Sequence, residues 1–220
     1  MAVSGAASHP PGTSSAAGDG VRLAADGVDA ASPPPGGSAA AGDGFRKVSE
    51  REIHAGRVVR LTESVFATPD GGRMTRDIVH HRGAVAVVAV DGDEVVLLRQ
   101  YRTPVESELL EIPAGTRDVG GEDPAGTARR ELAEEAGLAC ESLDELGTFY
   151  NSPGFCDELS HLFLATGLSA VPRQPDGAEE EWMTVERVSL EEAEAMIDRG
   201  EIRDAKTIIG LLLALRRLGR

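Results

Sequence analysis

The sequence has little cysteine, few aromatic side chains and a shortage of positive charge. Its two cysteines, Cys140 and Cys156, have neither the spacing of metal ligands nor the number that a disulfide framework requires, so ordinary thiols in a reducing compartment are expected. Lysine and arginine together number 22 against 37 acidic residues, which gives a net charge of −15. Binding to nucleic acid or to an anionic membrane depends on basic side chains, so neither partner is expected.

Long apolar runs are also missing. No apolar core of a signal peptide follows Met1, and no run reaches the roughly 20 residues that span a membrane. Residues 1–44 consist mainly of Ala, Gly, Ser and Pro, and they cannot bury enough apolar surface to offset the entropy lost on ordering. We therefore expect a cytoplasmic protein in which residues 1–44 form a disordered tail.

The chain beyond this tail has the composition of a folded domain. The turn signal Pro69–Gly72 between two strand-like segments predicts a small β-meander over residues 45–80. The adjacent His80 and His81 are interpreted as a strand end, with no nucleophile partner recognisable for a hydrolytic triad. Gly83–Val90 is a nearly unbroken apolar run, which predicts a strand buried on both faces.

Three helices are predicted after that strand. The first two have capping residues at their starts, and the three cover Asp123–Gly137, Ser189–Arg199 and Lys206–Leu218. The apolar residues of the last helix are too few for a membrane span and suit packing against a sheet. We therefore predict an α/β fold over residues 81–220, an α/β/α sandwich in which helices cover both sides of a mixed sheet.

The residues most suited to a functional site lie in one stretch, Gly115–Leu138. On the helix that Asp123 caps, Glu131, Glu134 and Glu135 fall on neighbouring ridges. Like charges at these spacings cost a few tenths of a kcal/mol per pair, which a solvated surface helix tolerates. Clustered carboxylate oxygens also suit Mg2+ or Mn2+. The residue types alone leave a solvated acidic face and a metal site as open alternatives.

The same stretch resembles the Nudix box, a family pattern written G-x5-E-x7-R-E-U-x-E-E-x-G-U in which U is aliphatic. Glu122 and the run Arg130–Leu138 fit the pattern without exception. Six residues rather than five separate Gly115 from Glu122, and this longer spacing is similar to the ADP-ribose pyrophosphatase branch of the family. Pro153, fifteen residues after Leu138 in an S-P-G context, resembles a marker of the same branch.

The resemblance implies the α/β/α sandwich and a Mg2+-dependent pyrophosphatase, with Mn2+ possible, that splits ADP-ribose into AMP and ribose 5-phosphate. The metal ligands that it implies are Glu131, Glu134, Glu135 and the carbonyl of Ala114. Arg130 would orient these glutamates through charge-assisted hydrogen bonds. In similar enzymes the part that corresponds to residues 45–80 is exchanged between two subunits, so a homodimer is implied as well.

The resemblance also supplies candidates for substrate contacts and for the general base. The substrate contacts are Arg102, Glu111, Pro153 and Glu158. The residue type alone allows two interpretations of Arg102, as a side chain at a strand end or as a bidentate phosphate ligand. It likewise allows Glu158 to be either a site residue or a charge at a strand edge. Hydrolysis needs a base, and similar enzymes use a glutamate in the loop before the last strand. Glu179 is the first candidate and Glu180 the second, although a solvated acidic loop is the alternative.

Other functions stay open at this point. A Nudix hydrolase could act on a different nucleoside diphosphate sugar or on an oxidised nucleotide. A non-catalytic sensor of ADP-ribose is disfavoured, because such proteins typically have an eroded box and an attached DNA-binding domain. An acidic structural module without any ligand is the third alternative.

Overall fold

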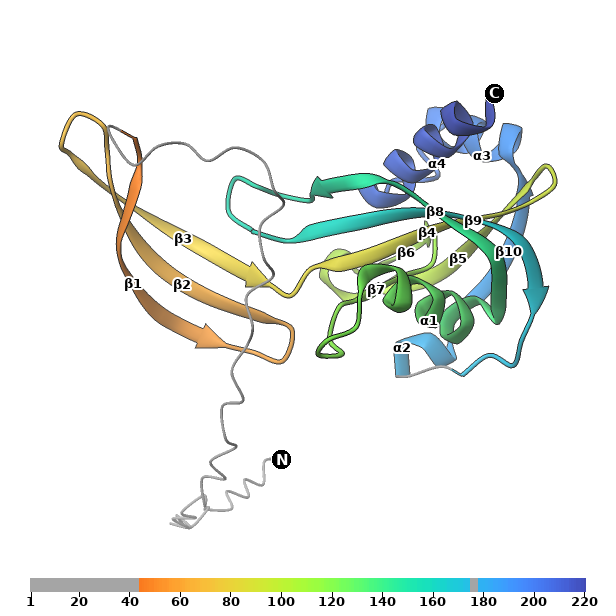
Figure 1. Ribbon diagram of the computed structural model, residues 1–220, viewed down its shortest axis with the longest axis horizontal. Helices are drawn as coiled ribbons and strands as arrows, with labels where there is room; N and C mark the ends of the chain where they lie inside the picture. The colour runs from red at the N-terminus through yellow and green to blue at the C-terminus, as the bar shows by residue number, and fades with distance from the viewer. Residues whose placement is uncertain (1–43, 175–177) are drawn as a thin grey trace, which may run out of the picture. The chain divides into compact units, whose positions relative to one another are not determined.

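The computed structural model describes residues 44–174 and 178–220, and of Ala178 and Glu179 only the backbone. The predicted tail therefore lies outside the described residues, apart from Gly44. The described chain forms two β-sheets and a set of helices that pack on the larger sheet (Figure 1). No helix in this described part is both long enough and apolar enough to cross a membrane.

The smaller sheet is antiparallel and comes first in the chain. Its strands are β1 (Arg46–Ala55), β2 (Val59–Ala67) and β3 (Arg73–His81), in the order β1-β2-β3. The backbone N–H of Gly71 donates to the carbonyl of Thr68 in the turn that joins β2 to β3, where Gly71 has a φ of 83°. The predicted turn is thus confirmed, and His80 and His81 end β3 as the sequence indicated.

The larger sheet has seven strands and mixed directions. They are β4 (Ala84–Asp91), β5 (Glu94–Arg102), β6 (Ser107–Glu111), β7 (Ala114–Thr116), β8 (Leu138–Tyr150), β9 (Leu159–Ala170) and β10 (Thr184–Ser189). The order is β10-β5-β4-β9-β8, while β6 pairs with β5 and β7 pairs with β4. The central pair of β4 and β9 is parallel, whereas β8 and β5 run antiparallel to their neighbours.

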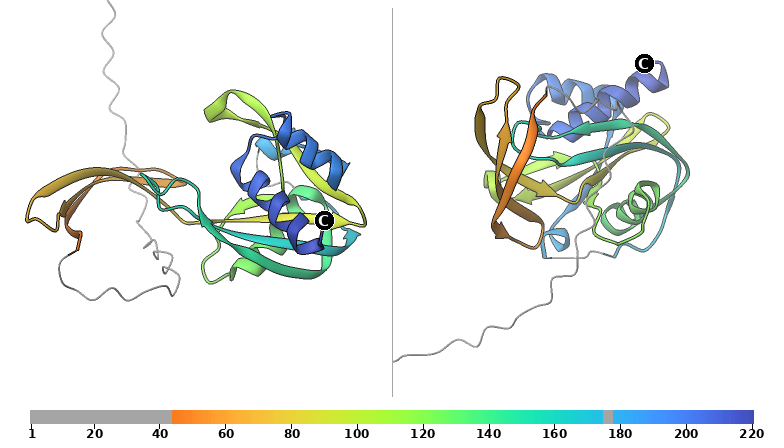
Figure 2. Two further views of the ribbon diagram at one scale, coloured as in Figure 1. Left: turned by 90° about the horizontal axis from the view of Figure 1, so that it is seen from above. Right: turned by 60° about the vertical axis from the view of Figure 1, so that its left-hand side comes forward.

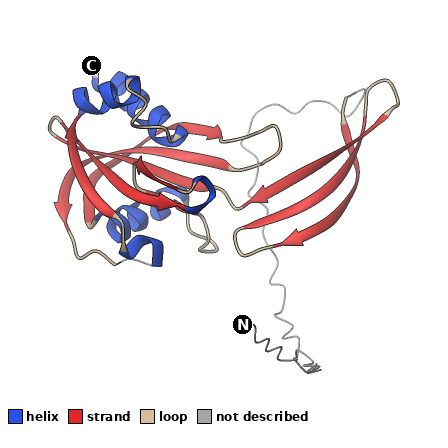
Figure 3. Cartoon of the chain, turned by 180° about the vertical axis from the view of Figure 1, so that it is seen from behind, coloured by secondary structure: helices blue, strands red, loops and turns tan. Residues whose placement is uncertain are grey.

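Helices lie on both faces of this sheet (Figures 1 and 2). Their bounds are η1 (Thr103–Val105), α1 (Pro124–Ala136), α2 (Ala178–Glu181), α3 (Leu190–Asp198) and α4 (Ala205–Leu218). Val87 of β4 packs in the core under α1, while its neighbour Val88 packs in the core under α3 and α4. The apolar run is therefore buried on both faces, and the predicted α/β/α sandwich with a mixed sheet is confirmed (Figure 3).

The ends of α1 have the capping groups that the sequence predicted. The carboxylate of Asp123 accepts a hydrogen bond from the backbone N–H of Gly126 at 2.6 Å, which satisfies one of the free amides of the first turn. Gly137 ends the helix with a φ of 66°, in the left-handed region. These caps fix which residues of α1 face the sheet, and so they fix the position of the glutamates described next.

Candidate active site

Two glutamates of α1 are buried against β7. The backbone N–H of Ala114 donates to Oε2 of Glu135 at 2.8 Å. A Cβ atom added to Gly115 would lie 2.0 Å from the carboxyl carbon of Glu131, so the strand reaches this carboxylate only because residue 115 has no side chain. Both glutamates are buried, which excludes the solvated acidic face for Glu131 and Glu135.

Burial also disfavours the charged form of these two carboxylates. It raises the pKa of Glu131 to about 7, against the opposing effect of Arg130, and the charges of Glu134 and Glu180 raise it further. Burial raises the pKa of Glu135 to about 8, although the N–H of Ala114 opposes the shift. A cation beside both groups would stabilise their charged forms.

Arg130 joins the loop before α1 to the glutamates on the helix. Its Nη1 lies 2.8 Å from Oε1 of Glu131 and 2.8 Å from Oε2 of Glu134. Its Nε and Nη2 both lie 3.4 Å from Oε2 of Glu122, and that oxygen also accepts a hydrogen bond from the hydroxyl of Thr127 at 2.9 Å. The arginine thus contacts two of the glutamates that the sequence predicted it to orient.

The oxygen atoms available here fit a hard divalent cation. Within the described residues, no group of three or more His, Cys, Asp or Glu side chains is arranged to hold a metal, and Glu134 is paired with Arg130 instead. Mg2+ usually takes only one or two protein carboxylates and completes its shell with water and phosphate oxygens. Glu131 and Glu135 meet that requirement, because both are buried one helical turn apart on α1.

The structure pairs two of the predicted substrate contacts with each other. Nε and Nη2 of Arg102 donate to the two carboxylate oxygens of Glu111, both at 2.7 Å. Burial would raise the pKa of Glu111, but Arg102 and Lys206 outweigh it, so the pKa lies below its ordinary value. Sequence reasoning missed Lys206, which contacts both Glu111 and Asp204; the only signal was its place at the start of a helix.

Pro153 and Glu158 lie in the loop between β8 and β9, at the end of β3. The backbone N–H of Val79 donates to the carbonyl of Phe155 at 2.8 Å, and Nδ1 of His81 lies 3.6 Å from Oε1 of Glu158. Across the part of the chain that is described, no hydrogen bond or ion pair joins Glu158 to the glutamates of α1. The structure therefore places Pro153 and Glu158 beside the small sheet.

An apolar hollow of about 490 Å³ lies between the small sheet and this loop. The loop contributes Pro153 and Phe155, and the small sheet contributes Phe66 and Ile78. Tyr150 at the end of β8 completes the ring of large side chains. Residues far apart in the sequence form this hollow, so no local pattern could have predicted it.

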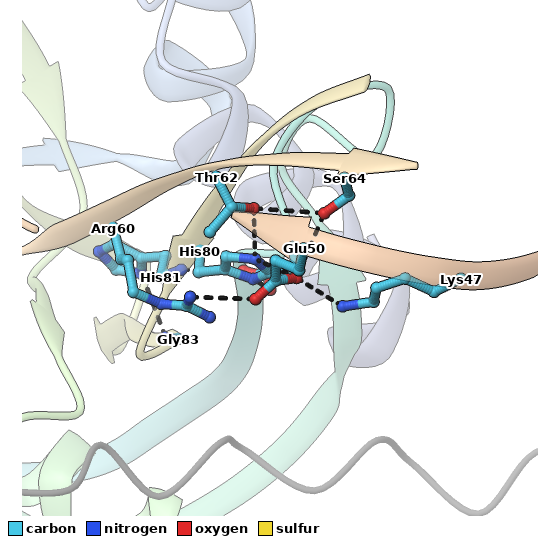
Figure 4. Close-up of polar contacts among 9 residues, drawn as sticks. Lys47, Glu50, Arg60, Thr62, Ser64, His80, His81 and Gly83 are labelled. Atoms are coloured by element: carbon cyan, nitrogen blue, oxygen red, sulfur yellow. Dashed lines mark hydrogen bonds and ion pairs between the residues drawn. The ribbon is translucent and has the colours of Figure 1, made fainter. Parts of the chain in front are cut away.

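A cluster of polar contacts joins the end of β3 to this loop and to the other strands of the small sheet, and Figure 4 shows the contacts within the small sheet. Nδ1 of His80 lies 2.5 Å from Oδ2 of Asp157, and the backbone N–H of His81 donates to Oδ1 of Asp157 at 2.8 Å. Nε2 of His80 lies 3.1 Å from the hydroxyl of Thr62, so this histidine does have a hydroxyl partner, which the sequence did not reveal. That hydroxyl belongs to a fully buried side chain and cannot reach a substrate, so the three groups form no hydrolytic triad.

Glu50 completes the cluster on the small sheet. Its Oε2 accepts from Nζ of Lys47 at 2.6 Å, and its Oε1 accepts from Nη1 of Arg60 at 3.0 Å. The hydrogen bond from Lys47 and the one from Arg60 lower the pKa of Glu50 to about 2, although burial opposes them. The cluster therefore stabilises the small sheet and its junction with the loop.

Of the two candidate bases, only Glu180 has a side chain within the described residues. Nη2 and Nη1 of Arg173 donate to the carbonyls of Glu180 and Met183, at 2.8 and 3.2 Å, and hold this segment in place. The charge of Glu180 contributes to the raised pKa of both Glu131 and Glu135. The side chain of Glu179 lies outside the described residues.

Comparisons with known proteins agree with this geometry. Residues 79–208 match the NUDIX domain family. The methanol dehydrogenase activator of Bacillus methanolicus is 41% identical over 165 residues, which are 74% of this chain and 89% of that protein. The ADP-ribose pyrophosphatase of Bacillus subtilis (strain 168) is 40% identical over 161 residues, 73% of this chain and 86% of the relative. A solved ADP compounds hydrolase has the same fold, with a TM-score of 0.70 at 22% identity over 83% of this chain and 100% of that one.

Proposed function

Because this chain belongs to the NUDIX domain family, we propose that it is a Mg2+-dependent pyrophosphatase that hydrolyses ADP-ribose to AMP and ribose 5-phosphate. The observation that carries the proposal is the pair of buried carboxylates, Glu131 and Glu135, beside a strand that only Gly115 brings close enough. The similarity to an ADP-ribose pyrophosphatase supports the choice of substrate. Each of these supports is independent of the other.

Glu131, Glu135 and the carbonyl of Ala114 would hold Mg2+, with Mn2+ as the alternative. A divalent cation bound there would polarise the pyrophosphate oxygens and offset the charge that develops on them. Glu134 stays a proposed ligand, and it would have to leave Nη1 of Arg130 to serve as one. Arg130 would then keep Glu131 in place, because the two are already in contact.

The remaining roles follow from where the described side chains lie. A glutamate ahead of β10 would accept a proton from the attacking water, with Glu179 as the first candidate and Glu180 as the second. Arg102 would bind the substrate phosphates, because guanidinium suits bidentate contact with anionic oxygens. Pro153 and Glu158 would contact the rest of the nucleotide, and Glu111 would act through Arg102.

The setting of the reaction is also a proposal. We place the protein in the cytoplasm, because its substrate class and reduced thiols suit that compartment. We further propose a homodimer that forms through residues 45–80, where every residue of β1 is exposed within one copy of the chain. Residues 81–220 would form the hydrolase domain of each copy.

The test is a substrate panel on the purified protein with Mg2+. ADP-ribose, GDP-mannose and an oxidised purine nucleotide are incubated separately, and the products are separated by ion-exchange chromatography. We expect AMP and ribose 5-phosphate from ADP-ribose at the highest kcat/KM, and no product after EDTA treatment. Preferential cleavage of another compound would assign the chain to a different substrate, and binding of ADP-ribose without turnover would favour a sensor.

A further inference from the structure

A buried cluster of charges joins the start of α4 to the strands beside the candidate site. The side chain of Glu111 on β6 is only 1% exposed, and both of its oxygens accept hydrogen bonds from Arg102 on β5. Nζ of Lys206, in the first turn of α4, makes a third contact with the same carboxylate, through Oε2. Three separate elements therefore meet at one carboxylate.

A chain of hydrogen bonds through Asp204 and Thr207 ties the same helix start to the end of β6. Asp204 caps α4, and its Oδ2 accepts from the backbone N–H of Thr207 at 2.9 Å and from its hydroxyl at 2.6 Å. The hydroxyl of Thr207 in turn accepts from the backbone N–H of Ile112 at 2.9 Å. Two residues later the N–H of Ala114 holds Glu135, so the start of α4 supports the segment that reaches the site.

Lys206 is unusual among the basic residues of this chain. The sequence has only one other lysine, Lys47, whose side chain is 46% exposed, whereas that of Lys206 is 16% exposed. A largely buried ammonium group is costly unless carboxylates surround it. Here Nζ contacts Glu111 and also lies 2.9 Å from Oδ1 of Asp204. These two carboxylates therefore offset the cost of burying the ammonium group of Lys206.

Arg102 keeps part of its guanidinium free for a ligand. Its side chain is 34% exposed, and its hydrogen bonds within the described residues use only Nε and Nη2. A guanidinium has five N–H donors, so Nη1 can still donate to an anionic oxygen. The pKa of Arg102 is raised mainly by its hydrogen bond to Glu111, and the charge of Glu135 adds to this, which places the arginine within electrostatic reach of the site.

We propose that Lys206 is a positioning residue, which fixes the carboxylate of Glu111 so that Glu111 aligns Arg102 with the substrate phosphates. The inference rests on the proposed function, because Arg102 needs an anionic ligand at the site. A carboxylate held by Arg102 alone can rotate together with it. A third contact from α4 fixes the plane of the carboxylate, and with it the direction of the free guanidinium donors.

The first experiment compares Lys206→Met and Lys206→Arg with the wild type, using Mg2+ and ADP-ribose. Methionine keeps much of the buried stem and removes the ammonium, so Arg102 loses its fixed direction. We expect KM to rise about tenfold in Lys206→Met while kcat stays within about twofold, the size that coupled charged contacts usually show. Lys206→Arg should bring KM most of the way back to the wild-type value.

The matched control is Lys47→Met, which removes the other lysine from an exposed ion pair with Glu50 in the small sheet. Exposed pairs of this kind contribute little, so its KM should equal that of the wild type. Circular dichroism and thermal unfolding are recorded for every variant. A variant that merely loses structure would show a smaller active fraction, and therefore a lower apparent kcat at unchanged KM.

A double-variant cycle tests whether Lys206 acts through Glu111. If it does, Lys206→Met adds less than about twofold to KM in a Glu111→Gln background, because the carboxylate that it positions is already neutral. Should Lys206→Met alone fail to fold, Lys206→Gln, which keeps a hydrogen-bond donor for Glu111 and Asp204 but removes the charge, replaces it in the cycle. If KM of the double variant instead rises by the product of the factors seen in the two single variants, Lys206 does not act through Glu111 and the proposal is overturned.

Failure of this inference and failure of the proposed function give different results. A wild-type protein that cleaves no nucleoside diphosphate compound would overturn the proposed function, and the inference with it. Wild-type turnover combined with an unchanged KM in Lys206→Met would overturn only the role of Lys206. A fall in kcat of Lys206→Met at unchanged KM would also overturn only the role of Lys206.

Discussion

At the scale of single residues, the candidate site depends on how closely a strand can approach a helix. Gly115 lies against the carboxylate of Glu131, and Ala114 donates its N–H to Glu135. The glycine that begins the box is therefore required by contact with a glutamate sixteen positions later in the sequence. Its role can be tested separately from that of the carboxylates.

Gly115→Ala should remove most of the activity. The added Cβ would lie 2.0 Å from the carboxyl carbon of Glu131, so the glutamate or the strand has to move. A displacement of about 1 Å is expected to lower kcat/KM by about 100-fold. The control is Gly120→Ala in the loop that follows β7, where an added Cβ meets nothing within 4 Å. Equal activity in both variants would show that the close approach of the strand is not needed.

The buried glutamates should make the metal-free protein lose stability as pH rises. The pKa values of Glu131 and Glu135 are raised from an ordinary value of 4.5 to about 7 and about 8. Between these limits the folded state binds more protons than the unfolded state, so the free energy of unfolding falls with rising pH. The contribution is fully present below the ordinary value and is lost by about pH 8.

Thermal unfolding of EDTA-treated protein between about pH 5 and about pH 8 measures this effect. Glu135→Gln should flatten the dependence, since the amide does not titrate, and it should also abolish most turnover with Mg2+ while the fold is kept. Added Mg2+ should stabilise the wild type more at the upper end of this range, because binding needs charged carboxylates. A wild-type profile that rises with pH would contradict the assignment.

At the scale of elements, the loop between β8 and β9 is fastened to the end of β3. Asp157 is central, because its carboxylate contacts the side chain of His80 and the backbone N–H of His81. Its own N–H donates to the carbonyl of Val79 at 3.1 Å. The loop that contains Pro153 therefore takes its position from the small sheet.

Asp157→Ala should loosen both the loop and the end of β3. It removes two hydrogen bonds but leaves the backbone bridge between Val79 and Cys156. Because the aspartate is partly exposed, the loss is expected to be about 1 kcal/mol. Hydrogen exchange should become faster in β3 and in the loop and stay unchanged in α1. The control is Asp144→Ala on β8, where the exposed carboxylate accepts a hydrogen bond from Ser142 at 3.2 Å. Similar exchange in both variants would contradict the role of Asp157.

At the scale of the whole molecule, the two cores are formed entirely by the larger sheet and its helices. Their buried members all lie between Val85 and Leu215. The small sheet contributes no member to either core and leaves β1 exposed. Its stability must therefore come from its own polar cluster, its junction with the loop, or a second copy of the chain.

Light scattering should give twice the mass of one chain for the purified protein, because a second copy would cover the exposed β1. Removal of residues 1–43 should leave the protein a dimer of the shortened chain, with the melting temperature and kcat unchanged, since composition predicts that the segment cannot build a core. A shift of the truncated protein to the monomer mass would contradict this prediction and would assign an interface to the tail. A monomeric wild type would contradict the proposed homodimer.

Much of the fold could be predicted from the sequence because its signals are local. The cap at Asp123, the stop at Gly137 and the turn at Pro69–Gly72 each depend on neighbours a few positions away. The unbroken apolar run of β4 indicated burial on both faces for the same reason. The box pattern likewise placed Glu131 and Glu135 on one helix before any tertiary contact was known.

The tertiary structure alone decided how these groups are paired. Glu111 and Lys206 are far apart in the sequence, yet α4 brings them together, and His80 at the end of β3 meets Asp157 in the loop between β8 and β9. No sequence pattern fixes such contacts, because they depend on how elements pack after they have formed. The sequence by itself determined the three longer helices, the buried strand β4 and the glutamates of the box. Packing determined which carboxylates are buried, and so which of them are suited to bind a metal.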